Sequence, residues 1–389
     1  MTGLTKRILF VLDYFHPHVG GGETLFLELA RALVTRGWQV TVLTLREPGN
    51  QREDLLDGIR IKRVTTPPIA RRYWFILLAV FPALRLAADA DIVHAGGYAS
   101  AWAARLAGWW RRRPTVLTVY EVFGDSWYAL KSTLGIFGGL FRIYELATLH
   151  LAFDRYLCIS RFTRDRLARF TRIPLARTTV VYPAVDYNFW RPGSHRARGL
   201  KAELGLHEQT FVYTYFGRPG ASKGVDFLIE AAALLSVRLP DSHLLLLLSP
   251  VPSRGYQTIL SMITTSNLSK TVTVLAPVPR CDLPTYLLAS DCVVVPSFSE
   301  GFGYSAVEAA TLGCRVVATS GHAVPEVLGN HGTFVPFGDP LALAEALLAT
   351  ARNRPDIQPM PPMYTVFKHV EETLAVYDHF LGETGHTRS

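Results

Sequence analysis

Cysteine is scarce in this sequence, and the few cysteines are far apart. Only four occur among 389 residues, Cys158, Cys281, Cys292 and Cys314. Structural zinc sites and disulfide frameworks need closely spaced or paired cysteines, which are missing here. His16 and His18 are near each other, but no third metal ligand is nearby. The sequence therefore predicts neither a metal centre nor a disulfide scaffold, and it fits a reducing cytoplasm.

Long apolar runs are also missing. The longest, from Tyr73 to Leu84, has about 12 residues and contains Pro82, whereas a helix needs roughly 20 apolar residues to cross a bilayer. The N-terminal run Ile8–Leu12 leads into Asp13 without a small-residue cleavage site, so we interpret it as a strand rather than a signal peptide. We expect no transmembrane helix and a cytoplasmic protein.

Two nucleotide-related patterns are absent. The G-x-G-x-x-G spacing of dinucleotide sites does not follow the first predicted strand, so we expect no bound NAD. No nucleic-acid-binding motif or aromatic-basic repeat is present either. We therefore expect no nucleic-acid partner.

The charge is unevenly distributed. The net charge is +8, and residues 1–190 hold 25 Lys and Arg against 15 Asp and Glu, while residues 191–389 hold 15 against 17. A basic first half favours anionic partners such as lipid headgroups or a phosphorylated acceptor.

Short apolar runs alternate with amphipathic stretches along the chain. Strands are predicted at 8–12, 39–45, 59–64, 91–94, 115–120 and 155–159, and a second series starts at Phe211. This alternation is typical of a parallel sheet with helices on both faces. The segment Trp190–Gly193 between the two series is interpreted as a linker.

The length exceeds what one hydrophobic core usually serves, so we predict two doubly wound α/β domains. The first comprises residues 1–187 and 364–389, because an amphipathic helix at 364–381 follows a proline-rich segment and crosses back. The second comprises residues 188–363. Doubly wound sheets bind ligands at the carboxyl ends of their strands, so we expect a cleft between the domains.

The segment Ser299–Glu308 is the most informative motif. It lies between an apolar strand at 291–296 and a helix at 306–313, and it places Glu300 and Glu308 around a glycine-rich turn. The backbone N–H groups of Gly303, Tyr304 and Ser305 are the expected donors to an anionic diphosphate. Carboxylates do not bind phosphate, so their expected partners are sugar hydroxyls.

Two further loops follow predicted strands. Gly20-Gly21-Gly22-Glu23 opens a helix after the first strand, as a phosphate-binding turn would. Arg218 and Lys223 bracket a flexible loop after the strand at 211–216. Both cations can reach one diphosphate and neutralise it without a metal ion.

Together these residues resemble the family-4 retaining glycosyltransferases of the GT-B fold. The shared pattern is a glutamate, seven residues and a second glutamate, here Glu300 and Glu308, and the likeness extends through Gly20–Glu23, Gly217–Gly224 and Pro325-Glu326-Val327. The resemblance implies that Glu308 binds the ribose and Glu300 the donor sugar. It further implies backbone contacts from Gly303, Tyr304 and Ser305, diphosphate contacts from Arg218, Lys223, Gly21 and Gly22, and a base contact at Val278.

One position departs from the family pattern. Relatives usually carry a histidine that touches the donor sugar after the strand at 115–120, and here Tyr120 takes its place, with Glu121 beside it. Tyrosine can donate a hydrogen bond but does not change charge near neutral pH. We retain Tyr120 as a candidate catalytic residue. His94 also ends a predicted strand, and a structural role is at least as well supported there.

The resemblance implies transfer of a hexose-type group from a nucleoside diphosphate sugar to a hydroxyl acceptor, with retention of anomeric configuration and no metal or other cofactor. A sugar-nucleotide epimerase, a phosphorylase and a catalytically silent sugar-nucleotide-binding protein are the alternatives.

The expected acceptor is a glycan, a lipid-linked glycan or a glycolipid, bound by the basic first domain. Arg71–Phe75 and Trp109–Arg113 combine aromatic and cationic side chains, which suits peripheral attachment to an anionic membrane. The alternative is that these aromatics pack inward in ordinary helices.

Overall fold

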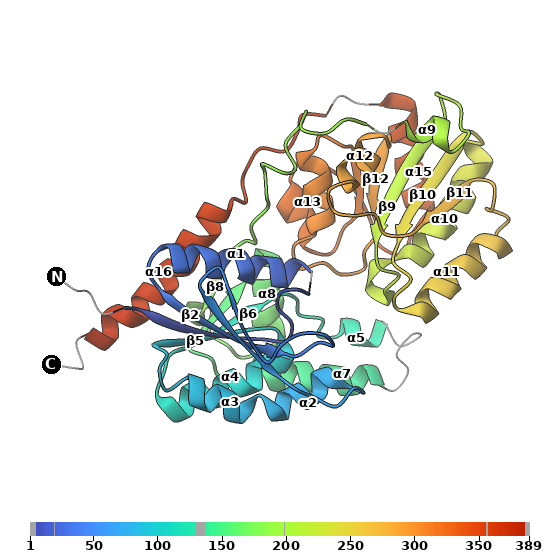
Figure 1. Cartoon of the computed structure of the whole chain (residues 1–389). Helices are drawn as coiled ribbons and strands as arrows, with labels where there is room; N and C mark the ends of the chain where they lie inside the picture. The colour runs from blue at the N-terminus through green and yellow to red at the C-terminus, as the bar shows by residue number, and fades with distance from the viewer. Residues whose placement is uncertain (1–4, 19, 130–136, 198, 355–356, 386–389) are drawn as a thin grey trace. The chain divides into compact units, whose positions relative to one another are not determined.

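A computed structural model describes residues 5–18, 20–129, 137–197, 199–354 and 357–385. The chain divides into two compact units (Figure 1). Unit 1 comprises Met1–Ala184 and Tyr364–Ser389, and unit 2 comprises Val185–Met363. The first boundary, between Ala184 and Val185, falls before the position expected at 187/188. In the segment predicted as a linker, Trp190 is buried, whereas Arg191, Pro192 and Gly193 are exposed.

The described part of unit 1 contains an eight-stranded sheet in the order β3-β4-β2-β1-β5-β6-β7-β8. All pairs are parallel except that of β3 with β4. The strands are β1 (Arg7–Leu12), β2 (Gln39–Leu45), β3 (Glu53–Leu56), β4 (Ile59–Val64), β5 (Ile92–Gly96), β6 (Thr115–Val119), β7 (Arg155–Cys158) and β8 (Thr178–Val180). This confirms the predicted doubly wound architecture, whereas β3 was not predicted.

Helices cover both faces of this sheet, and alternate residues of β1 point to opposite faces. Ile8, Phe10 and Leu12 pack in the cluster that includes α1 (Gly21–Thr35) and α16 (Val366–Gly385). Leu9 and Val11 pack in the cluster on the other face. That face is covered by α2 (Arg71–Leu78), α3 (Val80–Leu86), α4 (Tyr98–Arg111) and α7 (Phe137–Leu149). The other elements within the described residues of this unit are α5 (Ser126–Ala129), α8 (Arg161–Phe170) and η1 (Leu175–Arg177).

The C-terminal helix α16 belongs to unit 1, as predicted. His94 Nδ1 in β5 lies 2.5 Å from the hydroxyl of Tyr377, and His94 Nε2 lies 2.8 Å from Thr118 Oγ1. Burial lowers the pKa of His94 to about 3, with a smaller effect from His369. Both ring nitrogens are therefore used inside the core, and His94 has a structural role.

Unit 2 contains a parallel sheet of six strands within the described residues, in the order β11-β10-β9-β12-β13-β14. The strands are β9 (Phe211–Gly217), β10 (Ser242–Leu248), β11 (Val272–Leu275), β12 (Cys292–Val295), β13 (Val316–Thr319) and β14 (Thr333–Val335). Its helices are α9 (Leu200–Glu203), η2 (Ala221–Lys223), α10 (Val225–Arg238), α11 (Ser253–Thr265), α12 (Leu283–Leu288), α13 (Tyr304–Thr311), α14 (Ala323–Leu328) and α15 (Pro340–Asn353). Strands β9, β10 and β12 are central, and their side chains form most of the core.

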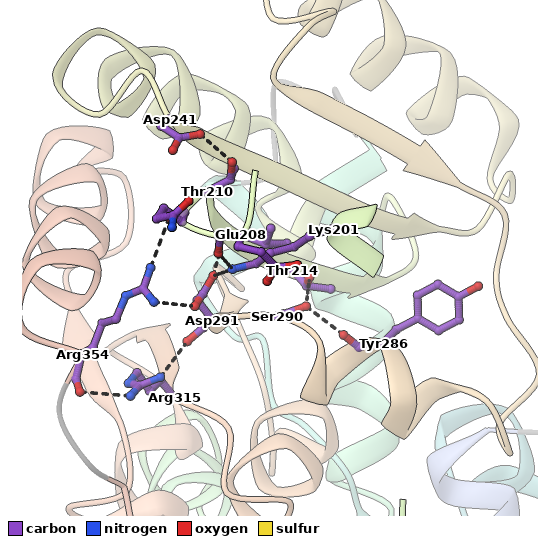
Figure 2. A network of polar contacts seen from close by, with 12 residues as sticks. Lys201, Glu208, Thr210, Thr214, Asp241, Tyr286, Ser290, Asp291, Arg315 and Arg354 are labelled. Atoms are coloured by element: carbon purple, nitrogen blue, oxygen red, sulfur yellow. Dashed lines mark hydrogen bonds and ion pairs between the residues drawn. The ribbon is translucent and has the colours of Figure 1, made fainter. Parts of the chain in front are cut away.

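A polar network fixes the amino-terminal edge of this second sheet (Figure 2). Asp291, immediately before β12, accepts a hydrogen bond from Val212 N of β9 at 2.9 Å. Its carboxylate also lies 3.2 Å from Lys201 Nζ and 3.6 Å from Arg354 Nη1. Because parallel strands share one direction, this network lies at the edge opposite to the loops that follow β9 and β12.

Among the described residues, no helix combines the length and apolar character that a bilayer span requires.

Candidate active site

The loop between β12 and α13 places the central motif at the carboxyl edge of the second sheet. Gly303 ends this loop with φ = 87°, and a Cβ atom there would lie 2.4 Å from Cγ2 of Val324. Only glycine meets both conditions without strain. Helix α13 begins at Tyr304, two residues before its predicted start, and Gly303 O accepts from the N–H groups of Ala306 and Val307. The N–H groups of Tyr304 and Ser305 thus belong to the first turn, where they have no partner within the helix.

Glu300 forms an ion pair that the sequence did not predict. Its Oε1 lies 2.6 Å from Lys223 Nζ and 2.9 Å from Ser297 Oγ. Burial alone would raise the pKa of Glu300, but Lys223 and the hydrogen bonds outweigh it and lower that pKa. The structure therefore joins one residue expected on the donor sugar to one expected on the diphosphate, and Glu300 is held as a carboxylate.

His322 lies next to this pair and was missed by sequence reasoning. Its Nε2 lies 3.0 Å from Thr319 Oγ1, and its Nδ1 accepts from Val324 N at 3.2 Å, which caps α14. Burial lowers the pKa of His322 to about 4, although Glu300 acts in the opposite direction. The neutral imidazole of His322 thus positions the loop between β13 and α14. The sequence feature that could have identified His322 is its position just before the Pro325–Val327 segment.

Glu308 occupies the first turns of α13 and is buried. Its Oε1 lies 3.5 Å from Arg280 Nη2. Burial raises the pKa of Glu308 to about 7, although Arg280 and the neighbouring Trp190 indole act to lower it. Burial and Glu308 also raise the pKa of Tyr304. Arg280 and Trp190 were not predicted as site residues, because they lie far from the motif in sequence.

The loop that follows β9 lies against the loop that follows β12. Gly224 has φ = 63°, and a Cβ atom there would be 2.0 Å from Pro296 O, while Phe298 N donates to Ser222 O at 2.8 Å. This contact places Lys223 beside Glu300. Arg218 starts the same loop and is exposed. Val278 is partly buried against the cluster that contains Tyr286.

In unit 1, the glycine turn meets Tyr120. Gly21 is exposed and is the first residue of α1, and Gly20 precedes it as the N-cap. A Cβ atom on Gly22 would lie 2.9 Å from both Cζ and the hydroxyl oxygen of Tyr120. Two residues expected on the same ligand are therefore in close approach, and the absence of a side chain at Gly22 makes room for the ring.

Two buried carboxylates also organise this edge of unit 1, and neither was predicted. Asp13, directly after β1, accepts from Ser100 N at 2.7 Å at the start of α4 and pairs with Arg72 Nη2 at 2.6 Å. Glu145 accepts from the N–H groups of Phe123 and Gly124 at 2.8 and 2.7 Å, which holds the loop that follows Tyr120.

Within the described ranges, no three potential metal ligands cluster together. His18 Nδ1 instead lies 3.0 Å from Glu47 Oε1.

Comparisons with known proteins cover both units. The family described as "Glycosyltransferase Family 4" matches residues 19–189, and "Glycosyl transferases group 1" matches residues 210–353. A D-inositol 3-phosphate glycosyltransferase of Mycobacterium tuberculosis is 30% identical over 336 residues, which cover 81% of this chain and 68% of the relative. One of Mycobacteroides abscessus is 28% identical over 331 residues, which cover 81% and 72%.

The fold has solved counterparts. Anabaena Alr3699/HepE in complex with UDP-glucose superposes with a TM-score of 0.77 at 19% identity, over 96% of this chain and 99% of that one. At this identity the likeness concerns the fold. The family matches, the mycobacterial relatives and the two parallel-sheet units agree, and the chain belongs to the family-4, group 1 glycosyltransferases with a GT-B fold.

Proposed function

We propose that this glycosyltransferase moves a hexose-type group from a nucleoside diphosphate sugar to a hydroxyl acceptor, with retention of anomeric configuration. The observation that carries the proposal is the cluster in unit 2. Lys223 meets Glu300 at 2.6 Å in the loop that leads into α13, and Glu308 is buried in that helix. A cation, the first N–H groups of a helix and two carboxylates suit a diphosphate flanked by sugar and ribose hydroxyls.

Each polar group then has a separate proposed partner. Lys223, Arg218 and the N–H groups of Tyr304 and Ser305 bind the diphosphate, and Glu300 accepts from the transferred sugar. Glu308 accepts from ribose hydroxyls and Val278 contacts the base. The solved HepE structure holds UDP-glucose, which supports a donor of this class. From unit 1, Gly21 and Gly22 contribute backbone to the diphosphate and Tyr120 contributes a hydroxyl to the sugar.

The proposed reaction needs no metal ion and no other cofactor. Bond cleavage leaves negative charge on the departing diphosphate and positive charge at the anomeric carbon. Lys223 has three N–H donors, so it can remain paired with Glu300 while it contacts phosphate. Stabilisation of charge where it develops in the transition state is the largest contribution expected from such a site.

Retention follows if the acceptor hydroxyl attacks from the face that the diphosphate leaves. No carboxylate in the described cluster is placed as a nucleophile: Glu300 is engaged by Lys223 and Ser297, and Glu308 is assigned to ribose. The leaving phosphate then takes the acceptor proton.

The proposed acceptor is a glycan attached to a lipid, or a glycolipid, bound by the basic unit 1. Its anionic headgroup would be attracted by the excess of Lys and Arg in residues 1–190.

The first test is ligand-induced stabilisation. UDP, GDP and ADP sugars are added separately, and the sugar of the correct nucleotide should raise the unfolding temperature, because a ligand of the folded state stabilises it. The stabilising donor is then incubated with lipid-linked acceptors, and the anomeric configuration of the product is read by NMR. Binding without transfer would point to a silent binding protein, dependence on inorganic phosphate to a phosphorylase, and an inverted product would overturn retention.

A further inference from the structure

Four helices of unit 1 cover one face of its sheet, and their outer sides expose large side chains. Figure 1 shows α2, α3, α4 and α7 side by side along this face. Their inner sides are buried, as Phe75, Ala83 and Ala104 illustrate. Since a surface helix normally places polar residues outward, the composition of the outer sides is the informative feature.

The outer sides carry large apolar side chains. Phe81 is 61% exposed on α3, and Trp109 and Trp110 on α4 are 64% and 67% exposed. Trp74 and Leu77 on α2 and Ile143 on α7 are also exposed. We call these six side chains the apolar face. The sequence had left open whether the aromatics at 73–75 and 109–110 pack inward; of these, only Phe75 is buried.

The charges on the same helices are almost all positive. Residues 71–86, 98–111 and 137–149 contain six arginines and one carboxylate, Glu145. Glu145 is buried and occupied by backbone N–H groups. Arg85 lies over the Phe81 ring at 4.4 Å, and Arg111 donates to Leu84 O at 2.9 Å, so two cations lie directly among the apolar groups.

The combination of exposed aromatic side chains with arginines indicates which partner binds the apolar face. Trp and Tyr favour the headgroup level of a bilayer, and arginines beside them attract anionic lipid. Arg72 and Arg142 pair with Asp13 and Asp125, whereas Arg85 lies over a ring and Arg111 donates to a backbone carbonyl. A second copy bound through the same face would bring Arg85 and Arg111 of both copies together, and the described parts of these helices contribute no exposed carboxylate to oppose them, which is unfavourable. Six large apolar side chains exposed on four neighbouring helices are more than scattered single ones, and such a concentration indicates an interaction site.

We propose that the apolar face docks unit 1 onto an anionic membrane surface, with Trp109, Trp110 and Phe81 inserted at the headgroup level. This inference deepens the proposed lipid-linked acceptor, because it brings unit 1 to the surface that carries such acceptors. It does not depend on the identity of the donor.

The test is flotation of the full chain with phosphatidylcholine vesicles, with or without phosphatidylglycerol, in the absence of donor. The full chain should float with the anionic vesicles. The double variant Trp109→Ser/Trp110→Ser should lower the partition coefficient on the order of tenfold or more, since two buried indoles are lost. Phe81→Ser should also lower it. Phe367→Ser is the matched control, because Phe367 is 70% exposed on α16, away from the apolar face, and it should bind unchanged.

Three outcomes would overturn the proposal. These are absence of binding to anionic vesicles, binding that Trp109→Ser/Trp110→Ser leaves unchanged, and a dimer in solution that the same variant dissociates, which would assign the face to a second copy. Donor-induced stabilisation of the same variants is measured without vesicles. It separates failure of membrane docking from failure of the proposed transferase chemistry, and it confirms that each variant folds.

Discussion

Lys223 Nζ lies 2.6 Å from Glu300 Oε1, although 77 positions separate the two residues in the sequence. The pair joins the loop after β9 to the loop after β12. It keeps Glu300 ionised at a buried position and holds Lys223 at the loop that leads into α13.

Replacement of Lys223 should impair turnover, whereas replacement of Lys201 should impair only stability. Lys223→Ala should lower kcat on the order of 100- to 1,000-fold, because a cation that stabilises the departing diphosphate is lost. Lys201→Ala is the matched control, since Lys201 also pairs with a carboxylate of unit 2, Asp291, but at the opposite edge of the sheet. It should lower the unfolding temperature and spare kcat. Equal loss of turnover in both variants would contradict the assigned role of Lys223.

The buried Glu308 should make stability depend on pH. Its folded pKa is raised from 4.5 to about 7, so the folded state holds this proton more tightly than the unfolded state does. The stability contributed by the protonated group is complete below pH 4.5 and is lost as pH rises through 7. Relative to Glu308→Gln, the unaltered protein should therefore lose up to about 3 kcal/mol of unfolding free energy over this interval. Denaturant unfolding at a series of pH values measures this loss of unfolding free energy. If the unfolding free energies of the two proteins change in parallel with pH, the prediction is contradicted.

The affinity for the donor should rise with pH, whereas the stability of the protein falls, because both depend on the ionisation of Glu308. A carboxylate accepts hydrogen bonds from ribose hydroxyls better than a carboxylic acid does. The dissociation constant of the donor should therefore fall as pH rises through about 7, and Glu308→Gln should bind weakly with a flat profile. Calorimetric titration at several pH values provides the measurement. A profile in Glu308→Gln identical to that of the unaltered protein would assign the pH dependence elsewhere.

Gly303 should tolerate no side chain. Gly303→Ala combines a positive φ with a Cβ atom 2.4 Å from Val324, and it should cost about 1–3 kcal/mol of stability and displace the first turn of α13. Gly321→Ala is the control, because Gly321 has φ = 91° with nothing within 4 Å of the added atom. Both variants carry the backbone strain, but only Gly303→Ala should also weaken donor binding. Thermal unfolding and donor titration distinguish the two effects.

Gly22 and Tyr120 should be energetically coupled. Gly22→Ala forces the ring of Tyr120 to move, because the added Cβ would lie 2.9 Å from it. If Tyr120 contacts the donor sugar, kcat/KM should fall in Gly22→Ala and in Tyr120→Ala, and the double variant should be less impaired than the sum of the two. Strict additivity would show that the close approach has no role in turnover. Tyr120→Phe isolates the hydroxyl.

Local sequence patterns predicted most of the fold. The strands at 8–12, 39–45 and 59–64 were placed closely, because buried parallel strands are continuous apolar runs. The edge strand β3 was missed, since its exposed Glu53–Leu56 segment has no such run. Its signal was Asp57-Gly58, both with positive φ, which form the two-residue turn between β3 and β4.

The candidate site was predicted less completely than the fold. Glycine spacing located the loop at 299–308, because a turn before a helix requires specific backbone angles and glycine permits them. The partners of its glutamates were not predicted. Lys223, Arg280 and Trp190 reach them from separate parts of unit 2, and sequence separation contains no information on such distances.

By itself, the sequence determined what depends on neighbouring residues: the alternation of strands and helices, the glycine turns and the excess of basic residues in the first half. Only the tertiary structure decided which side chains are removed from water. Burial raises the pKa of Glu308 while Lys223 lowers that of Glu300, so two glutamates of one motif acquire opposite ionisation behaviour. Packing likewise decided that Phe75 faces the core and Trp109 faces outward. Burial and ion pairing depend on contacts between distant segments, and the folded chain alone establishes them.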